Sequence, residues 1–185
     1  RNSGVAVMFN GDLMYVYSSK GLQVFDVSDP KNPTKAGEPI ATRTAHSSKW
    51  RDTGGAAMVQ NGDRIYLAGI EGIRVMDVSN PKVPVIVGDA IATDAIYATA
   101  NVALAMHGNT LYVAGGQGLA VFTIENKDKP ENVGEVIQAG VFAPEGGAAI
   151  EIIGQKMYLA GGNGFATFDI SDPEKPKSAD LQDCK

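Results

Sequence analysis

Short apolar segments separated by polar turns run along the whole chain, and no segment shows a sustained helical period. The segments are rich in β-branched and aromatic residues, which favours strands. In one of them, Leu22 and Val24 point to one side of the expected strand. Phe25 and Val27 point to the other side, so both faces are apolar. An antiparallel sheet with one face in water would alternate apolar with polar residues, so we expect sheets that are covered on both faces.

A block of 23 residues occurs four times, and its copies start at residues 11, 62, 108 and 154. Successive starts are 51, 46 and 46 residues apart, which is the period of propeller blades built from four short strands. Every copy has Gly, Tyr, Gly and Pro at the same four places, and in the first copy these are Gly11, Tyr15, Gly21 and Pro33. Such agreement within one chain indicates a structural requirement that is met four times.

Glycine and asparagine mark two hairpins in each block. Asn10 precedes Gly11, and Asn-Gly between apolar runs predicts a tight hairpin with both turn residues at positive φ. His107 stands at the place of this asparagine in the third copy, so we expect it to be a turn residue. Gly21 predicts a second hairpin about ten residues further on. A small-residue segment before the block fits an inner strand, and a short polar segment after it fits the rim.

These elements predict an all-β fold, a β-propeller with four four-stranded antiparallel blades. The chain is expected to form one domain or segment, 1–185, with blades at approximately 4–40, 54–91, 102–137 and 147–182. Two arrangements stay open: a closed four-blade ring, or part of a larger propeller completed by a longer parent chain or a second subunit. An open arc would expose about 300–600 Å² of apolar surface on each end face. Leaving one such face in water costs on the order of 8–15 kcal/mol, so the ends must be covered.

The strand cores resemble a known repeat family. The sequences LQVFDVSD, IRVMDVSN, LAVFTIEN and FATFDISD, each followed by a turn that ends in Pro, are similar to the LVIVD-repeat family of β-propellers. The third copy departs from the pattern, with Thr123 where the others have Asp26, Asp77 and Asp169, and with Lys127 in place of the turn proline. The resemblance implies a bacterial or archaeal protein that is extracytoplasmic (periplasmic, secreted or at the cell surface). It supplies no catalytic residues.

Charge and composition exclude some partners. The chain has 16 Lys and Arg against 21 Asp and Glu, evenly spread, so we expect no nucleic acid as a partner. No apolar run approaches the roughly 18 residues of a membrane span, so none is expected. No export signal is visible from Arg1 onward, which suggests a processed or excerpted product. Cys184 is the single cysteine, so no internal disulfide is possible.

An enlarged connection between the first two blades is the expected recognition element. The segment 41–53 is five residues longer than its later counterparts and holds the only tryptophan together with several cations. Two aromatic residues in the next connections share its expected position at the channel mouth. The candidate contacts for a ligand or partner are therefore Arg43, His46, Trp50, Arg51, Tyr97 and Phe142. The alternative is that Trp50 packs over a neighbouring blade in a solvated loop, and that Tyr97 and Phe142 fill space between blades.

Two other patterns are interpreted as turns rather than ligand sites. The glycines around Gly116 lack the following helix that a phosphate-binding loop needs, so they predict a hairpin. The oxygens of Asp26, Ser28 and Asp29 lack the spacing, glycine and terminal glutamate of an EF-hand loop. Such side chains before a proline usually bind their own turn backbone. We therefore expect no metal and no cofactor.

Three hypotheses for function follow. The first is a non-catalytic scaffold or binding module that recognises a protein or small ligand on the channel face. The second is an enzyme at the channel mouth that uses His46 with a carboxylate such as Asp94 or Glu145. The third is a structural subunit that associates with further blades or a second subunit to complete a larger propeller.

Overall fold

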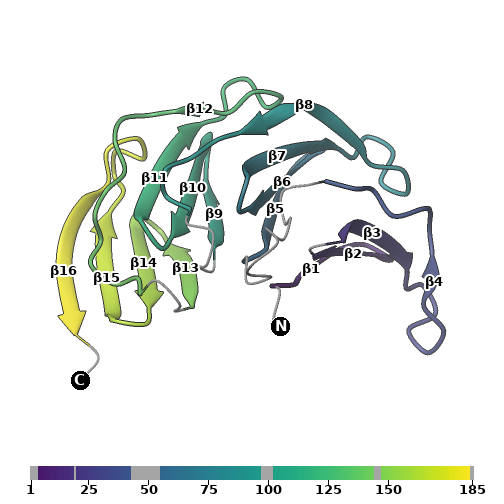
Figure 1. Cartoon of the computed structure of the whole chain (residues 1–185), viewed down its shortest axis with the longest axis horizontal. Coiled ribbons are helices and arrows are strands. Elements are labelled where there is room, and N and C mark those ends of the chain that lie inside the picture. Colours follow the sequence, from purple (N-terminus) through teal and green to yellow (C-terminus); the bar gives the residue numbers. More distant parts are fainter. Residues whose placement is uncertain (1–3, 19, 43–54, 97–101, 144–146, 184–185) are drawn as a thin grey trace.

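The computed structural model describes residues 4–18, 20–42, 55–96, 102–143 and 147–183. In this part of the chain all regular structure is β, arranged as four four-stranded antiparallel sheets (Figure 1). None of the described residues forms a helix long and apolar enough to cross a bilayer.

Each sheet is one blade of four strands that are consecutive in the sequence and paired in sequence order. The strands are β1 (Ala6–Asn10), β2 (Leu13–Ser18), β3 (Gly21–Asp26), β4 (Thr34–Lys35), β5 (Ala57–Asn61), β6 (Arg64–Gly69), β7 (Gly72–Asp77), β8 (Val85–Ile91), β9 (Ala103–His107), β10 (Thr110–Gly115), β11 (Gly118–Thr123), β12 (Glu131–Asn132), β13 (Ala148–Ile153), β14 (Lys156–Gly161), β15 (Gly164–Asp169) and β16 (Lys177–Asp183). We number the blades 1 to 4 in chain order.

The blades stand side by side in an arc that is open on one side (Figure 1). The first strands of the blades, β1, β5, β9 and β13, lie on the inner side of the arc, and the last strands lie on its outer side (Figure 1). This arrangement confirms the propeller architecture. The outer strands differ in length: β4 and β12 have two residues each, whereas β8 and β16 have seven.

The first hairpin of each blade turns one residue later than predicted. In blade 1, Asn10 is the last residue of β1 and pairs with Leu13, so the turn consists of Gly11 and Asp12. Gly11 has a φ of 57°, in the left-handed region that glycine tolerates. His107 is also a strand residue, at the end of β9, so its expected place in a turn is wrong.

The second hairpin lies where the sequence places it. Gly21 has a φ of 105° and begins β3 opposite Ser18. A Cβ on Gly21 would lie 2.1 Å from the carbonyl oxygen of Ile40, so a larger residue does not fit. The corresponding hairpin in blade 3 includes Gly116, which confirms that this glycine-rich stretch is a turn.

Three apolar cores hold the arc together, one between each pair of successive blades. Between blades 1 and 2, Tyr15 and Leu22 pack with Ile65 and Met76, and all four side chains are fully buried. The other two cores join blade 2 to blade 3 and blade 3 to blade 4. Each inner blade is thus covered on both faces, as its two-sided apolar pattern predicts. Among the described residues no core joins blade 4 to blade 1.

Candidate functional site

The second hairpin of each blade, between its second and third strands, lies at the same end of the sheets as the connections between blades. We call this end the connection face. The structure describes the first parts of the second and third connections, residues 92–96 and 138–143. The backbone N–H of Gln117 at one tip donates to the carbonyl oxygen of Ala95 at 3.1 Å. The N–H of Asn163 at the next tip donates to Val141 at 3.0 Å. These two bonds fix the described parts of both connections against the hairpin of the blade that each enters.

Glycine is required where a connection crosses a hairpin. A Cβ on Gly115 would lie 2.5 Å from the carbonyl oxygen of Ala95. At the same place in blade 4, a Cβ on Gly161 would lie 2.3 Å from the oxygen of Val141. These glycines therefore serve close packing of backbone on backbone.

A small hollow opens on the connection face between blades 3 and 4. Its volume is about 70 Å³, and it is lined by Gly116, Gln117, Gly118, Gln138, Ala139, Gly140 and Phe142. The Gln138 amide donates to the carbonyl oxygen of Gln117 at 3.0 Å, which fixes one wall. Backbone amides, a glutamine side chain and an aromatic ring offer contacts to an uncharged polar group.

Phe142 is the one predicted contact residue that the structure describes. It is half-buried, packs against the core between blades 3 and 4, and lines the hollow. Its carbonyl oxygen accepts a 3.1 Å hydrogen bond from the Asn163 side chain. Its position agrees with both readings of this residue, as a contact and as a spacer between blades. The other predicted contacts lie outside the described residues: Arg43, His46, Trp50, Arg51 and Tyr97.

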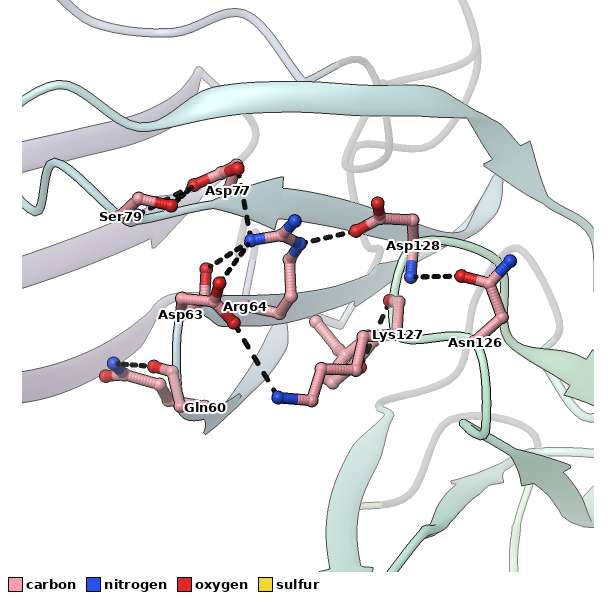
Figure 2. A network of polar contacts seen from close by, with 10 residues as sticks. Gln60, Asp63, Arg64, Asp77, Ser79, Asn126, Lys127 and Asp128 are labelled. Atoms are coloured by element: carbon pink, nitrogen blue, oxygen red, sulfur yellow. Dashed lines mark hydrogen bonds and ion pairs between the residues drawn. The ribbon is translucent and has the colours of Figure 1, made fainter.

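The opposite end of the blades, which we call the turn face, carries a cluster of charged side chains around Arg64 (Figure 2). Arg64 of blade 2 contacts Asp63 at 3.0 Å and Asp77 at 3.1 Å through Nη1. Its Nε donates to Asp128 of blade 3 at 2.5 Å. The hydrogen bond to Asp128 raises the pKa of the Arg64 guanidinium. The Arg64 side chain is 14% exposed and contacts three carboxylates, one of them in blade 3. It therefore links blades 2 and 3, and its charge is already neutralised within the protein.

In blades 1, 2 and 4 the aspartate that ends the third strand caps the turn that follows it, as predicted. Asp26 accepts hydrogen bonds from the N–H of Ser28 at 3.1 Å and from its hydroxyl at 2.6 Å. These bonds, with a 3.0 Å contact to Lys82 of blade 2, lower the pKa of Asp26 to about 2. Within the described ranges no three His, Cys, Asp or Glu side chains are grouped so that they could hold a metal.

The repeated tyrosine binds the next blade, a role that the sequence did not reveal. The hydroxyl of Tyr15 donates to the carbonyl oxygen of Pro81 at 2.8 Å. Tyr112 repeats this bond to Pro173 at 2.7 Å. Tyr66 repeats it to Lys127 at 3.2 Å. Burial raises the pKa of Tyr66 and of Tyr112 to about 12, so these hydroxyls stay protonated donors. The sequence shows that the tyrosine recurs, but its partner lies in another blade.

Comparison with known families identifies the repeat. The LVIVD repeat family matches residues 3–38, 59–90 and 147–179, which together exceed half of the chain. The chain belongs to the LVIVD repeat family. The third blade falls outside the matches, and it is the copy in which Thr123 and Lys127 replace the usual aspartate and proline.

Solved structures similar to this LVIVD chain show the fold alone, because their sequence identities are low. A candidate 6-phosphogluconolactonase from Bacteroides uniformis has a TM-score of 0.73 at 16% identity, covering 96% of this chain and 56% of that chain. The periplasmic gluconolactonase PpgL from Pseudomonas aeruginosa has a TM-score of 0.68 at 12% identity, covering 97% and 56%. The computationally designed Ika8 protein has a TM-score of 0.63 at 13% identity, covering 98% and 49%. The LVIVD chain thus spans about half the length of these structures. None of the curated proteins matches it.

Proposed function

We propose that this LVIVD-repeat chain is a non-catalytic binding scaffold that recognises a protein or a small ligand on its connection face. The observation that carries the proposal is the hollow between blades 3 and 4, where Gln117, Gln138 and Phe142 converge on a rigid base. Support for a fixed base comes from the two described connections, which are hydrogen-bonded at Ala95 and Val141 to the hairpin of the blade that each enters. Variable loops on a fixed scaffold are where binding proteins place their contacts.

The described side chains favour binding over catalysis. His107, the one histidine in the described ranges, lies at the end of β9 on the turn face, away from the hollow. The hydroxyls of Tyr15, Tyr66 and Tyr112 are engaged in bonds between blades. The hydroxyls of Ser28 and Ser79 donate to the carboxylates of Asp26 and Asp77. Activation of a serine nucleophile needs a base such as histidine beside its hydroxyl instead.

The contact set combines the hollow with the enlarged connection. The structure contributes Gln117, Gln138 and Phe142. The sequence contributes Arg43, His46, Trp50, Arg51 and Tyr97, which belong to the connections that lead to this face. Aromatic residues and arginine carry a large share of the energy in many interfaces, so this set suits recognition.

The test is a binding screen with variants on the connection face. The immobilised chain is screened against peptide and glycan arrays, and the captured probe is then titrated against Phe142→Ala and Trp50→Ala. We expect at least a tenfold loss of affinity for each variant. Phe142→Ala should also lower the midpoint of thermal unfolding, because its ring packs against the core between blades 3 and 4, so affinity is measured well below that midpoint. Val85→Ala, on the outer strand β8, is the matched control and should bind normally. Equal losses for the control variant would reject the connection face as the site.

Hydrolysis of a sugar lactone is the second candidate function. It is supported by two similar structures, one a candidate 6-phosphogluconolactonase and one a periplasmic gluconolactonase. In this chain His46, with Asp94 or Glu145, would supply the acid-base groups. The test is turnover of gluconolactone and of 6-phosphogluconolactone by the wild type and by His46→Ala. Turnover that His46→Ala abolishes would replace the binding proposal with this one.

We also infer an extracytoplasmic location for the protein. The support is the resemblance to the repeat family, and PpgL, which has a similar fold, is described as periplasmic. The full-length protein fused to alkaline phosphatase, an enzyme active only outside the bacterial cytoplasm, tests this location. An inactive but stable fusion would contradict it.

A further inference from the structure

The outer strand of blade 2 carries exposed valines at places where the other three blades are polar. Val83 is 58% exposed and Val85 is 59% exposed. The residues at these two places in the other blades are Asn32 and Thr34, Lys129 and Glu131, and Lys175 and Lys177. Polar side chains are therefore compatible with the fold at both places, and the valines of blade 2 are not needed to build a blade.

These valines lie on an internal blade. Blade 2 stands between blades 1 and 3 in the arc (Figure 1), and its two faces are buried in the cores that it shares with them. The exposure of Val83 and Val85 on its outer side thus does not depend on what lies beyond either end of the arc. Exposed apolar side chains that lie next to one another are typical of interaction surfaces.

The outer edge of β8 has backbone groups that can pair with a further strand. β8 is the last strand of its sheet and pairs only with β7. In blades 1 and 3 the N–H groups of Ala36 and Val133, at the place of Val87, donate to the third strand. Because the direction of these groups alternates along an antiparallel strand, Ile86 turns its N–H and C=O to the free edge. Pro84 has no N–H, so the free ladder begins at Ile86.

The sequence of β8 does not protect this edge. Natural proteins commonly place charged residues, above all lysine, on exposed edge strands to prevent the addition of another chain. Blade 1 has Lys35 at the place of Ile86, and blade 4 has Lys177 at the place of Val85. Blade 2 instead has Val85, Ile86 and Val87 in a row, three residues that favour strands and carry no charge. Its edge is therefore suited to receive a strand.

A groove continues the apolar side of this edge. Val85 and Val87 are alternate residues of β8, so their side chains lie on one face of the strand, and Val87 packs against the core shared with blade 3. The groove beside them has a volume of about 430 Å³ and is lined by residues 87–91 together with Asp128 and Lys129 of the blade 3 turn. A strand added at the edge would lay alternate side chains along the valines and place the next one in this groove.

The charges around the groove favour a cation. Asp89 lines the groove, is exposed and forms no ion pair within the described part of the chain. The other two charged lining residues already have partners, because Asp128 contacts Arg64 at 2.5 Å and Lys129 contacts Glu131 at 3.9 Å. The uncompensated charge is thus negative, and a lysine or arginine side chain complements it.

We propose that the free edge of β8 binds an extended segment of a partner protein, which adds a fifth strand to blade 2. The segment runs antiparallel to β8, as the neighbouring strands of the sheet do, and exchanges main-chain hydrogen bonds with Ile86. It carries apolar side chains at alternate positions against Val85 and Val87. A basic residue precedes them and lies beside Asp89. In this mode of recognition the main chain supplies affinity and the alternate side chains supply specificity.

The test uses a synthetic peptide with blocked ends, Lys-Thr-Val-Thr-Val-Thr, titrated with the 185-residue chain by fluorescence anisotropy. We expect saturable binding, and roughly tenfold weaker binding of Lys-Thr-Thr-Val-Val-Thr, which has the same composition without the alternation. Replacing the lysine by glutamate should weaken binding about two- to fivefold, as expected for an exposed ion pair. Asp89→Asn should abolish this preference for lysine and leave the effect of alternation in place.

Methylation of single peptide nitrogens tests the main-chain bonds. The central threonine of the peptide lies opposite Ile86, so its N–H donates to the Ile86 carbonyl oxygen. Methylation of this nitrogen should weaken binding roughly fivefold or more, because it removes one hydrogen bond. The N–H groups of the two valines point away from β8, so methylation of the second valine is the matched control and should change affinity less.

Val85→Lys tests the edge of the protein itself. It gives blade 2 the residue that blade 4 has at this place, and the side chain is already exposed, so the variant should fold normally. We expect a roughly tenfold or greater loss of peptide affinity, because a lysine on an edge strand opposes strand addition. Thr34→Lys makes the same change at the same place in blade 1 and should leave affinity unchanged.

Three results would overturn the proposal. One is equal binding of the alternating and the rearranged peptide. Another is peptide affinity that survives Val85→Lys. The third is a wild-type chain that sediments as a dimer and becomes a monomer with Val85→Lys, because the edge would then serve a second copy. Phe142→Ala on the connection face should bind the strand peptide normally, so this test and that of the proposed binding function can fail independently.

Discussion

The hydroxyl of Tyr15 in blade 1 donates a 2.8 Å hydrogen bond to the carbonyl oxygen of Pro81 in the turn of blade 2. The tyrosine ring is fully buried in the core between these blades, and burial raises the pKa of its hydroxyl. The hydroxyl is therefore a proton donor throughout the neutral range. One residue thus contributes an apolar body to the core and a polar tip that sets how the two blades align.

Replacing Tyr15 by Phe should lower the free energy of unfolding by about 1 kcal/mol, because it removes one net hydrogen bond while the ring stays packed. Urea denaturation measures the change. The control is Tyr158→Phe, because the Tyr158 hydroxyl has no hydrogen-bond partner among the described residues. An equal loss in the control would show that the ring environment, and not the bond to Pro81, is responsible.

Gly161→Ala should be strongly destabilising, by about 1–3 kcal/mol or more, because the new Cβ would lie 2.3 Å from the Val141 carbonyl oxygen. The connection 138–147 must then move off the hairpin. Gly147→Ala is the matched control, since no atom lies within 4 Å of its Cβ position, and it should change stability by less than about 0.5 kcal/mol. Thermal denaturation of both variants compares them. Similar unfolding midpoints would refute the packing argument.

Stability should fall as the pH drops from about 5 to about 2. Hydrogen bonds from Ser28 lower the pKa of Asp26 to about 2 in the folded chain. The pKa values of Asp77 and Asp169 are also lowered, by hydrogen bonds from Ser79 and Ser171 respectively. An unfolded aspartate takes up its proton near pH 4, so the folded state binds fewer protons over this interval. The stabilisation is complete above the unfolded pKa and is lost as the pH falls through the folded pKa.

The pH dependence is measured as the free energy of unfolding in urea at a series of pH values. Asp26→Asn should be less stable than the wild type at pH 7, and the difference should shrink on acidification because both side chains are then uncharged. A difference that stays constant down to pH 2 would mean that the charge of Asp26 contributes nothing.

Arg64→Ala should destabilise the junction of blades 2 and 3 by about 1.5–3 kcal/mol. The guanidinium is largely shielded from solvent, and its loss leaves Asp63, Asp77 and Asp128 close together without their shared partner (Figure 2). Arg64→Lys should recover only part of the loss, because an ammonium group does not reproduce the planar fork. Chemical denaturation at low and high salt measures both variants. Full recovery by lysine would show that charge alone suffices.

The fold was predictable because the same physical requirement recurs in every copy of the block. Leu22, Val24 and Phe25 show that both faces of a strand are apolar, and in a repeated all-β chain stacked blades cover both faces. The prediction failed in detail at Asn10, which ends a strand instead of entering the turn. The turn begins with Gly11, which has the left-handed conformation. The Asn-Gly pattern therefore placed the start of the turn one residue too early, at Asn10.

The candidate site was less predictable, because its contacts join residues from different blades. The bond from Tyr15 to Pro81 spans 66 residues and depends on how two sheets align, which no local pattern encodes. The hollow beside Phe142 likewise needs the geometry of a connection and two hairpin tips. The proposed contacts at His46 and Trp50 stay predictions, since they lie outside the described residues.

The pairing of strands in sequence order has a consequence for how such a chain can grow. Each blade comes from one uninterrupted stretch of the sequence. In blade 2 that stretch holds both Tyr66, which bonds to the following blade, and Pro81, which accepts a bond from the preceding one. Duplication of one repeat within a gene therefore inserts a module that brings its own half of both new junctions.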